Sequence, residues 1–463
     1  MKRFSKIMGW SLMAAVILFT SCSDDDDSNP DDTPMDTTTI VDLALATNDL
    51  SILVEALTAA NLVETLQGDG PFTVFAPTNE AFTAFLTTNG FASLDDIPTD
   101  VLTQVLLNHV VSGTNTSGDL STGYISSLST SGVSGRNLSL FVDTTSGVEI
   151  NGVATVSTAD VTADNGVVHI VNGVIGLPTI VDHALANPAL SSLVGALTDG
   201  GNTTFTSLLS SPLTDFTVFA PVNDAFTAFT NPNGNDINNV LSNHVISGVA
   251  AFSDGLSNSY VNTLGTNADG DFLSQYINVD DGVTINGSSN VVIADVVATN
   301  GVVHAVDAVI DLPSVVTFAV ADPTFAPLVT ALTEGTPATD FVSVLSGAGP
   351  FTVFAPTDMA FSNLLTALSV EMVTDIDEAT LTAVLNHHVV SGNVRSGDLT
   401  DGISPATLEG DAITINLPGT DPNIADVTDG AGNMGIGIIA VDVQANNGVI
   451  HVLNQVMLPD TEN

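Results

Sequence analysis

The stretch GPFTVFAPTNEAF (70–82) decides the fold of this chain, because the chain repeats it twice more. The second copy is DFTVFAPVNDAF (215–226) and the third is GPFTVFAPTDMAF (349–361). Phe72, Phe216 and Phe351 are equivalent and are spaced by 216 − 72 = 144 and 351 − 216 = 135 residues. Solenoid repeats are about 20–50 residues long, so this period is that of a whole domain. The sequence therefore predicts three related modules in tandem.

Three further boxes recur in the same order in every copy. The opening box is IVDLALATNDLSILVEALT (40–58), IVDHALANPALSSLVGALT (180–198) and VVTFAVADPTFAPLVTALT (315–333). After the FTVFAP core come LLNHVVSG (106–113), LSNHVISG (241–248) and NHHVVSG (386–392). The last box is NGVVHIVNGVIGLP (165–178), NGVVHAVDAVIDLP (300–313) and NGVIHVLNQVMLP (447–459). Four ordered matches set the register of the repeat, and each module is long enough to bury its own core.

The core FTVFAP (72–77) is predicted to be a strand, because its residues alternate between two faces. One face is expected to carry Phe72, Val74 and Ala76, and the other Thr73 and Phe75. The final proline ends the strand, since it has no N–H to donate.

A helix is expected directly after this strand, and its first signal is an Asn or Asp in every copy. We expect Asn79, Asn223 and Asp358 to cap the helices that follow them, because their side-chain oxygens can accept a first-turn N–H. The opening boxes carry apolar residues at helical spacing. Strand-like stretches such as LSLFVD (138–143), VEING (148–152) and VTING (283–287) follow later, and the last box alternates as a strand. Helices in front and strands behind predict an α+β module.

The ordered boxes FTVFAPxNxAF, NHVVSG and NGVVHxVxxVLP resemble those of the fasciclin domain. The resemblance covers nearly all of residues 38–460 and implies a wedge-shaped β-sandwich flanked by helices. It also implies extracellular adhesion modules with no general catalytic site. Module boundaries are expected at 38–178, 179–313 and 314–460. Where animal members carry a tyrosine tied to integrin binding, this chain has Asn108, Asn243 and His387, so an integrin-type contact is not carried over.

The N-terminus has the features of a secretory signal, residues 1–21. Lys2, Arg3 and Lys6 precede an apolar run that ends at Phe19, which is too short for a comfortable membrane-spanning helix. Cys22 is the single cysteine and follows directly. This arrangement resembles the lipobox of bacterial lipoproteins, which implies cleavage before Cys22 and lipid attachment to its thiol. Phe19 departs from the aliphatic residue usual in that family.

An acidic, proline-containing segment follows the cysteine. Residues 22–37 hold almost no apolar side chains, so we expect a disordered tether. Its start, Cys-Ser and four Asp, resembles the export signal of Bacteroidetes surface lipoproteins. The resemblance implies an outer-membrane lipoprotein exposed on the cell surface; a plain solvated spacer is the alternative.

Composition excludes several classes of function. The basic residues are Lys2, Arg3, Lys6, Arg136 and Arg395, so removal of the signal leaves 2 − 52 = −50. Such a chain has no lysine for catalysis and no cationic patch for nucleic acid or anionic lipid. The membrane is expected to be contacted through the lipid anchor alone. We also expect a protein suited to salty surroundings, because ions screen its self-repulsion.

Each module carries two recurring histidines: His109 with His169, His244 with His304, and His388 with His451. A metal pair is one interpretation. The preferred one is structural, with buried imidazoles that tie a helix end or turn to a strand, because zinc needs three or four ligands and no third recurs. His183 and His387 do not recur at equivalent positions and are expected at the surface.

No cofactor, catalytic residue or metal ligand is predicted. The acid clusters Asp269-Gly270-Asp271 and Asp280-Asp281 do not fit an EF-hand, so weak divalent-cation screening is expected rather than a calcium cage. No GxSxG or HExxH motif occurs, so we expect no enzyme.

The leading hypothesis is a lipid-anchored cell-surface adhesion protein that makes multivalent cell–cell or cell–matrix contacts with surface or matrix proteins. The alternative is an envelope polysaccharide-binding protein, bridged by divalent cations.

Overall fold

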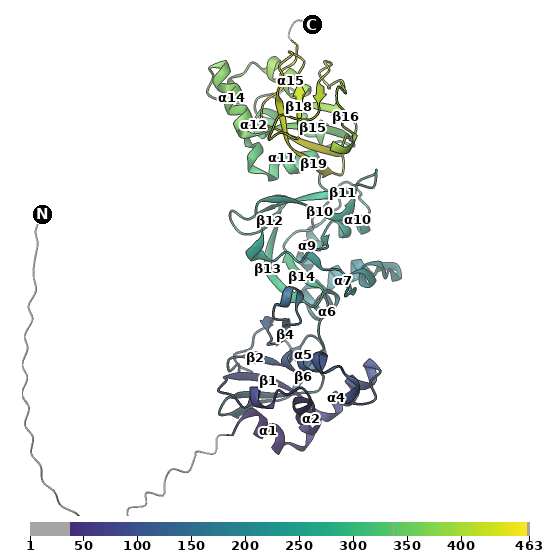
Figure 1. Ribbon diagram of the computed structural model, residues 1–463, viewed down its shortest axis with the longest axis vertical. Helices are drawn as coiled ribbons and strands as arrows, with labels where there is room; N and C mark the ends of the chain where they lie inside the picture. The colour runs from purple at the N-terminus through teal and green to yellow at the C-terminus, as the bar shows by residue number, and fades with distance from the viewer. Residues whose placement is uncertain (1–37, 337, 461–463) are drawn as a thin grey trace, which may run out of the picture.

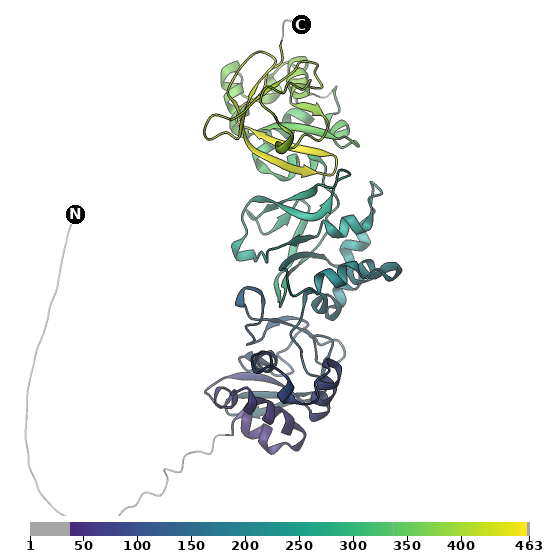
Figure 2. The same cartoon turned by 45° about the vertical axis from the view of Figure 1, so that its right-hand side comes forward.

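The computed structural model describes residues 38–336 and 338–460, which form three modules of helices and strands in a row (Figure 1). We call residues 38–178 module 1, 179–313 module 2 and 314–460 module 3. The view turned by 45° keeps the same end-to-end order (Figure 2). The predicted signal, Cys22 and the tether lie outside the described residues.

Module 1 has helices before and after the FTVFAP strand in sequence and ends in strands. Its helices are α1 Ile40–Ala46, η1 Asn48–Leu50, α2 Ser51–Ala59, α3 Val63–Leu66, α4 Asn79–Asn89, η2 Leu94–Asp96, α5 Thr99–Leu107 and η3 Val133–Gly135, where η marks a short 3-10 turn. Its strands are β1 Phe72–Pro77, β2 Val110–Ser112, β3 Gly123–Ser126, β4 Ser139–Asp143, β5 Glu149–Ile150, β6 Ala154–Ala163 and β7 Gly166–Val171.

Module 2 repeats this order with shorter helices after the FTVFAP strand. Its helices are α6 Ile180–Ala186, η4 Pro188–Leu190, α7 Ser191–Thr198, η5 Asp199–Gly201, α8 Thr204–Leu209, α9 Asn223–Ala228, α10 Ile237–Ser242 and η6 Ser253–Gly255. Its strands are β8 Phe216–Pro221, β9 Val245–Ser247, β10 Ser259–Thr266, β11 Phe272–Asn278, β12 Thr284–Ile285, β13 Ser289–Ala298 and β14 Gly301–Val306.

Module 3 keeps the order but has six strands in its sheet. Its helices are α11 Val315–Ala321, η7 Pro323–Phe325, α12 Ala326–Thr333, α13 Phe341–Leu345, α14 Asp358–Leu368, η8 Val373–Asp375, α15 Glu378–His387 and η9 Ser396–Asp398. Its strands are β15 Phe351–Pro356, β16 Val389–Ser391, β17 Thr414–Asn416, β18 Ala425–Thr428, β19 Ile436–Ala445 and β20 Gly448–Leu453. The predicted α+β class is confirmed in all three modules.

The sheet of each module has the FTVFAP strand near one edge and a single parallel pair. The strand order in module 1 is β2-β1-β7-β6-β5-β4-β3, and β1 pairs in parallel with β7 from Phe72↔Gly166 to Pro77↔Val171. The long strand β6 is bulged between Val156 and Val161, and beyond the bulge it pairs with β5 in the other half of the sheet. The bulge lets one continuous sheet turn back over itself, since bulges bend a strand and increase its twist.

Two cores lie on opposite faces of the FTVFAP strand, as its predicted alternation requires. In module 1, Val74 and Ala76 pack against α1, α2 and α5, with Leu53, Leu57 and Leu106 in the same cluster. Phe75 points the other way, into a cluster with residues of β4 to β7 that includes Leu140, Val142 and Ile150. One core therefore joins helices to sheet, and the other joins the two halves of the sheet.

The asparagine of the Asn-Gly pair before the last strand connects three segments of each module. They are the start of the first helix, the turn before the FTVFAP strand and the last strand. In module 1 the side chain of Asn165 accepts the N–H of Ile40 and donates to the carbonyl oxygens of Leu66 and Gly68. Asn300 and Asn447 make the equivalent bonds in the other modules. The next residue must be glycine, because a Cβ on Gly166 would lie 2.0 Å from the carbonyl oxygen of Phe72.

The predicted helix caps at Asn79, Asn223 and Asp358 are wrong. Each is the first residue of its helix, and Thr78 and Thr357 cap the first and third helices with their side chains. The side chain of Asn79 instead accepts the N–H of Ile52 at 2.9 Å, at the start of the neighbouring helix α2. Asn223 does the same for Ser192 of α7. Asn79 and Asn223 do accept a first-turn N–H, as predicted from their residue type, but the helix that each one caps is distant in sequence.

Among the described residues, no single helix is long and apolar enough to cross a membrane. Two consecutive helical segments reach the required length and apolar composition only when they are taken together, and they are bent by 100° relative to each other. They are Val315–Ala321 and Pro323–Thr333.

Candidate functional site

The first histidine of each module ties a helix end to the segment after the last strand. Nδ1 of His109 donates to the carbonyl oxygen of Val105 (2.7 Å), and Nε2 accepts the N–H of Ile175 (2.8 Å). His244 and His388 make the same two bonds in modules 2 and 3. One nitrogen must carry a proton and the other must not, so the ring is neutral. Burial lowers the pKa of each of these three histidines to about 4.

The second histidine of each module lies beside the bulged strand. Nε2 of His169 donates to the carbonyl oxygen of Asn115 (2.9 Å), and Nδ1 accepts the N–H of Asp160 (3.3 Å). His304 makes equivalent bonds in module 2, and Nε2 of His451 donates to Val394 in module 3. Both ring nitrogens of both histidines in modules 1 and 2 are therefore engaged with backbone groups, which leaves no lone pair there for a metal.

A serine and an aspartate join this second histidine in every module, and the sequence reasoning missed them. The hydroxyl of Ser117 donates to the carboxylate of Asp160 (2.6 Å), and Asp160 has a positive φ of 61° at the bulge. Ser253 with Asp295 and Ser396 with Asp442 repeat the pair, again with positive φ. The signal was in the sequence, since each aspartate lies five residues before the Asn-Gly pair.

This Ser–Asp–His grouping is not arranged for nucleophilic catalysis. A catalytic serine gives its proton to a histidine nitrogen, which an acid orients from the other side. In module 1 the serine hydroxyl donates to Asp160, while Nδ1 of His169 accepts a backbone N–H and Nε2 donates to a carbonyl. The grouping locks the loop that carries Ser117 onto the bulged strand.

The expectation that His183 and His387 lie at the surface is wrong, because both are fully buried. Nε2 of His183 donates to the carbonyl oxygen of Val297 (3.1 Å), and its ring meets that of Tyr124 edge-on at 5.7 Å between centroids. Burial lowers the pKa of His183 to about 4. His183 belongs to module 2 and Tyr124 to module 1, so the neighbouring module covers the histidine. The sequence of one module alone therefore could not predict that His183 is buried.

His387 lies at the far end of module 3 among carboxylates. Its Nε2 accepts the N–H of Gly430 (3.0 Å), and its Nδ1 lies 3.6 Å from a carboxylate oxygen of Glu409. The ligating atoms of His387, Glu409 and Asp411 come within 4.8 Å of one another. A metal on Nδ1 would force the ring proton onto Nε2, against the N–H of Gly430. Burial lowers the pKa of His387, although the acidic neighbours oppose this effect.

The two joints between modules are built from equivalent residues. In the first joint, Tyr124 of module 1 lies edge-on to His183 and its hydroxyl accepts a 3.3 Å hydrogen bond from Asn187. In the second, Tyr260 of module 2 lies edge-on to Phe318 (5.5 Å), and its hydroxyl donates to Asp322 (2.9 Å). Tyr124 and Tyr260 are therefore joint residues.

Backbone contacts repeat across the joints as well. The hydroxyl oxygen of Ser139 accepts the N–H of Val297, and that of Ser274 accepts the N–H of Gln444 (2.9 and 3.0 Å). The carbonyl oxygens of Pro178 and Pro313, the last residues of their modules, accept N–H groups of the next module. Each joint is thus a specified interface rather than a free linker.

Both arginines that follow the signal lie at these joints. Arg136 of module 1 pairs with Asp254 of module 2 at 2.8 Å and lies 3.9 Å above the ring centroid of Phe252. Arg395 of module 3 pairs with Asp271 of module 2. Asn393 also donates to Asp269 and Asp271, so the acid cluster 269–271 belongs to the second joint.

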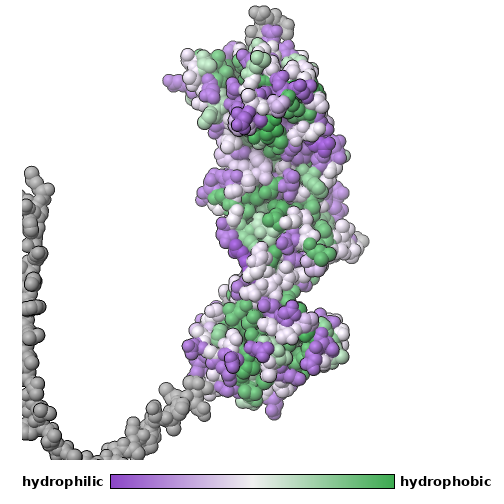
Figure 3. Space-filling view, viewed as in Figure 1, coloured by the Kyte–Doolittle hydropathy of each residue, from purple (hydrophilic) through white to green (hydrophobic). Residues whose placement is uncertain are grey.

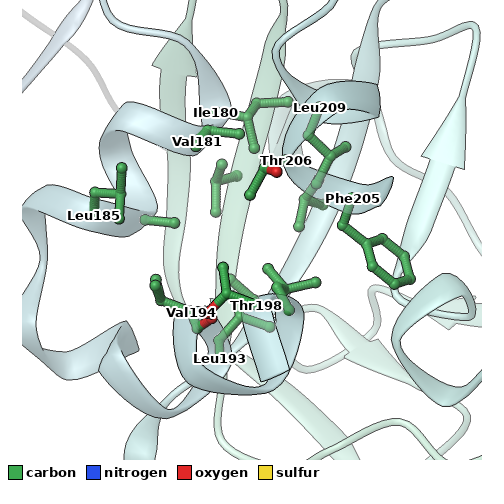
Figure 4. A pocket seen from close by; sticks show the side chains of 14 residues that line it. Ile180, Val181, Leu185, Leu193, Val194, Thr198, Phe205, Thr206 and Leu209 are labelled. Carbon is green, nitrogen blue, oxygen red and sulfur yellow. The ribbon is translucent and has the colours of Figure 1, made fainter. Parts of the chain in front are cut away.

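An apolar pocket lies between the opening helices and the sheet in each module and is largest in module 2. There it is lined by residues of α6, α7 and α8, including Leu193, Phe205 and Leu209, around a space of about 530 Å³ that includes its open mouth (Figure 4). The labelled side chains surround this space, and Thr198 and Thr206 are the only polar residues among those that line it. With so few groups to orient a ligand, we interpret it as loose packing of the helix core.

The outer surface carries no single dominant patch on the face drawn in Figure 3. Hydrophilic and hydrophobic residues are interspersed there over all three modules.

Comparison with known proteins identifies the domain family of the three modules. The model of the fasciclin domain matches residues 48–178, 188–313 and 324–459. Uncharacterized protein sll1735 of Synechocystis sp. is 37% identical over 147 residues, which are 32% of this chain and 98% of that protein. Transforming growth factor-beta-induced protein ig-h3 of Sus scrofa is 25% identical over 412 residues, 87% of this chain and 55% of that protein.

Two further matches extend along the chain. Human periostin is 23% identical over 444 residues, which are 91% of this chain and 47% of periostin. The chain therefore spans about half the length of ig-h3 and of periostin. A solved FAS1 domain pair from the insect cell adhesion molecule fasciclin I aligns with 57% of this chain and 96% of that structure, at 21% identity and a TM-score of 0.37.

Proposed function

This chain belongs to the fasciclin-domain family, and we propose that it is a lipid-anchored surface protein that makes multivalent adhesive contacts with other cells or with matrix. The observation that carries the proposal is the array itself: three modules of one adhesion-type family are held in a row by two equivalent joints. Linked sites raise effective concentration only if they can engage together, and a defined spacing favours this.

Anchoring is proposed through Cys22, at the N-terminal side of module 1. The acidic segment between Cys22 and α1 would hold the array off the membrane, and the lipid would supply the membrane affinity that the acidic modules lack. Module 3 would then be the part farthest from the cell (Figure 1). Cys22-Ser23 and the four Asp that follow, which resemble a surface-export signal, support an outer-membrane location with surface exposure.

The experiment expresses the full-length chain in a non-adhesive bacterium and measures attachment to cells and to matrix-coated surfaces. Cys22→Ser is the matched control, because it removes the anchor and leaves every described residue unchanged. The proposal expects labelled palmitate on the parent chain and attachment that disappears in the variant. Attachment by neither protein would contradict the adhesive role, and palmitate missing from the parent chain would contradict the anchor.

Polysaccharide binding bridged by divalent cations is the second candidate. The acidic composition favours it, because carboxylates bind hard cations. Retention on envelope polysaccharide that EDTA abolishes would favour this candidate over protein contacts.

A further inference from the structure

A groove beside the last described residues of module 3 is larger than its counterpart in module 1. It runs between α14, α15 and the last described residues, and its space is about 1140 Å³ including the part open to solvent. Its apolar lining includes Leu364, Leu368, Ile376, Leu381, Val384 and Leu458. The equivalent hollow of module 1, between α5 and Leu177, measures about 560 Å³ on the same basis.

The two hollows differ in size, and they also differ in one side chain on the helix that lines them. The residue five places before the first histidine is an amide in modules 1 and 2. Gln104 accepts bonds from the hydroxyl of Ser129 (3.0 Å) and the N–H of Thr130 (2.9 Å), and so ties helix α5 to the loop across the hollow. Asn239 ties α10 to Thr266 in the same way. Module 3 has Ala383 at this position, which cannot make the bridge.

In module 3, the loop equivalent to the one that Gln104 contacts in module 1 is acidic. Glu409 occupies the place of Ser129, because the residues before them, Leu408 and Leu128, donate equivalent backbone bonds. Glu409 lines the groove together with Asp460. Asp411 lies behind them and accepts the N–H of Asp460 (2.7 Å), while Asp429 is buried nearby and accepts the N–H of Leu458 (2.8 Å). His387 adds no positive charge, because its ring is held neutral by the N–H of Gly430. The groove is therefore apolar along its floor and negative at one rim.

We propose that this groove binds a basic amphipathic peptide segment of a partner protein. Apolar side chains of the segment would cover the leucine-lined floor, and its lysine or arginine would meet Glu409 and Asp460. Helix-in-groove and extended-segment recognition both use apolar anchors of this kind, and charge complementarity sets the sign of the partner. The groove belongs to module 3, which lies at the end of the described array away from module 1 (Figure 1).

The inference deepens the proposed adhesive function by naming a partner chemistry. Its test measures peptide binding in solution and not cell attachment. Peptide binding can therefore be absent when the cells attach, and present when they do not. A fluorescent peptide of leucine and lysine is titrated with the full mature chain at seawater ionic strength, which screens binding by net charge alone. Two companion peptides replace lysine by glutamate or leucine by glycine.

Two variants address the groove. Ala383→Gln restores the amide of module 1 without a change of charge, and Glu409→Gln removes one carboxylate from the rim. Glu80→Gln, on the exposed face of α4 in module 1, is the matched charge control. Circular dichroism and the unfolding midpoint confirm that each variant is folded.

We expect the leucine–lysine peptide to bind at least tenfold more tightly than either companion. Ala383→Gln and Glu409→Gln should each weaken it by about tenfold, and Glu80→Gln should not. Equal binding of the lysine–glycine peptide would overturn the proposal, because charge alone would explain it. Unchanged binding in both groove variants would overturn it as well.

Discussion

The hydroxyl of Tyr260 in module 2 donates a 2.9 Å hydrogen bond to the buried carboxylate of Asp322 in module 3. Burial raises the pKa of Tyr260, and the nearby carboxylate raises it further, so the phenol keeps the proton that it donates. At the first joint the partner is neutral: Asn187 donates to Tyr124 over a longer 3.3 Å. The same position thus carries a charge-assisted bond in one joint and a weaker neutral one in the other.

The charge difference predicts unequal effects when the two hydroxyls are removed. Tyr260→Phe leaves a buried carboxylate short of one donor and should lower the free energy of unfolding by about 1–3 kcal/mol. Tyr124→Phe is the matched control and should cost less, since its partner is neutral. Denaturant unfolding of the full chain measures both. Equal costs, or a larger cost for Tyr124→Phe, would contradict this account of the joint.

Buried neutral histidines predict a loss of stability in mild acid. For His109, His183, His244 and His388 the folded pKa of about 4 lies below the ordinary 6.5. The unfolded chain then binds more protons between these values, so stability is fully present above pH 6.5 and is lost as the pH falls toward 4. The difference is about 3 kcal/mol for each histidine at most.

Denaturant midpoints at pH 7, 6 and 5 test this, with imidazole titration by NMR as the direct readout. Carboxylates with depressed pKa values, such as Asp42 and Asp340, lose their contribution only below their ordinary 3.8, which separates the two effects. A constant midpoint from pH 7 to 5 would contradict the neutral-ring assignment.

Two glycines of module 2 should respond to alanine in opposite directions. A Cβ on Gly301 would lie 2.2 Å from the carbonyl oxygen of Phe216, so Gly301→Ala should separate β8 from β14 and cost about 1–3 kcal/mol. Gly195 lies in helix α7 with no atom within 4 Å of its Cβ position. Gly195→Ala should stabilise by about 0.5–1 kcal/mol. Thermal unfolding of both variants tests the pair, and a neutral Gly301→Ala would refute the close approach.

Net charge predicts that salt stabilises the chain. With two basic residues against 52 acidic ones after the signal, self-repulsion weakens the folded state until ions screen it. The unfolding midpoint should rise from low salt to seawater ionic strength. A midpoint that stays level or falls would exclude this effect.

Most of the module could be predicted from the repeated boxes, because strand alternation and helical spacing are local. The faces of Val74 and Phe75 and the α+β order are examples. Contacts between segments distant in sequence could not be predicted. Asn79 caps a helix that begins 28 residues earlier at Ser51, and the local pattern alone favoured its own helix. His183 looked exposed because its cover, Tyr124, comes from another module.

The joints show the same limit at a larger scale. The three tandem modules could be predicted, but not that Arg136, Arg395, Tyr124 and Tyr260 would lie at the joints. The groove of module 3 could not be predicted either, because Gln104 of module 1 contacts a residue 25 positions away and Ala383 cannot make that contact.

The central claim is that three linked modules adhere together more strongly than one. Cells that display the full-length chain are compared with cells that display residues 1–178, with equal surface density, and the shear needed to detach them from matrix or partner cells is measured. The account predicts attachment stronger by about 10²-fold or more for the three-module chain. Equal attachment by the single module would contradict it.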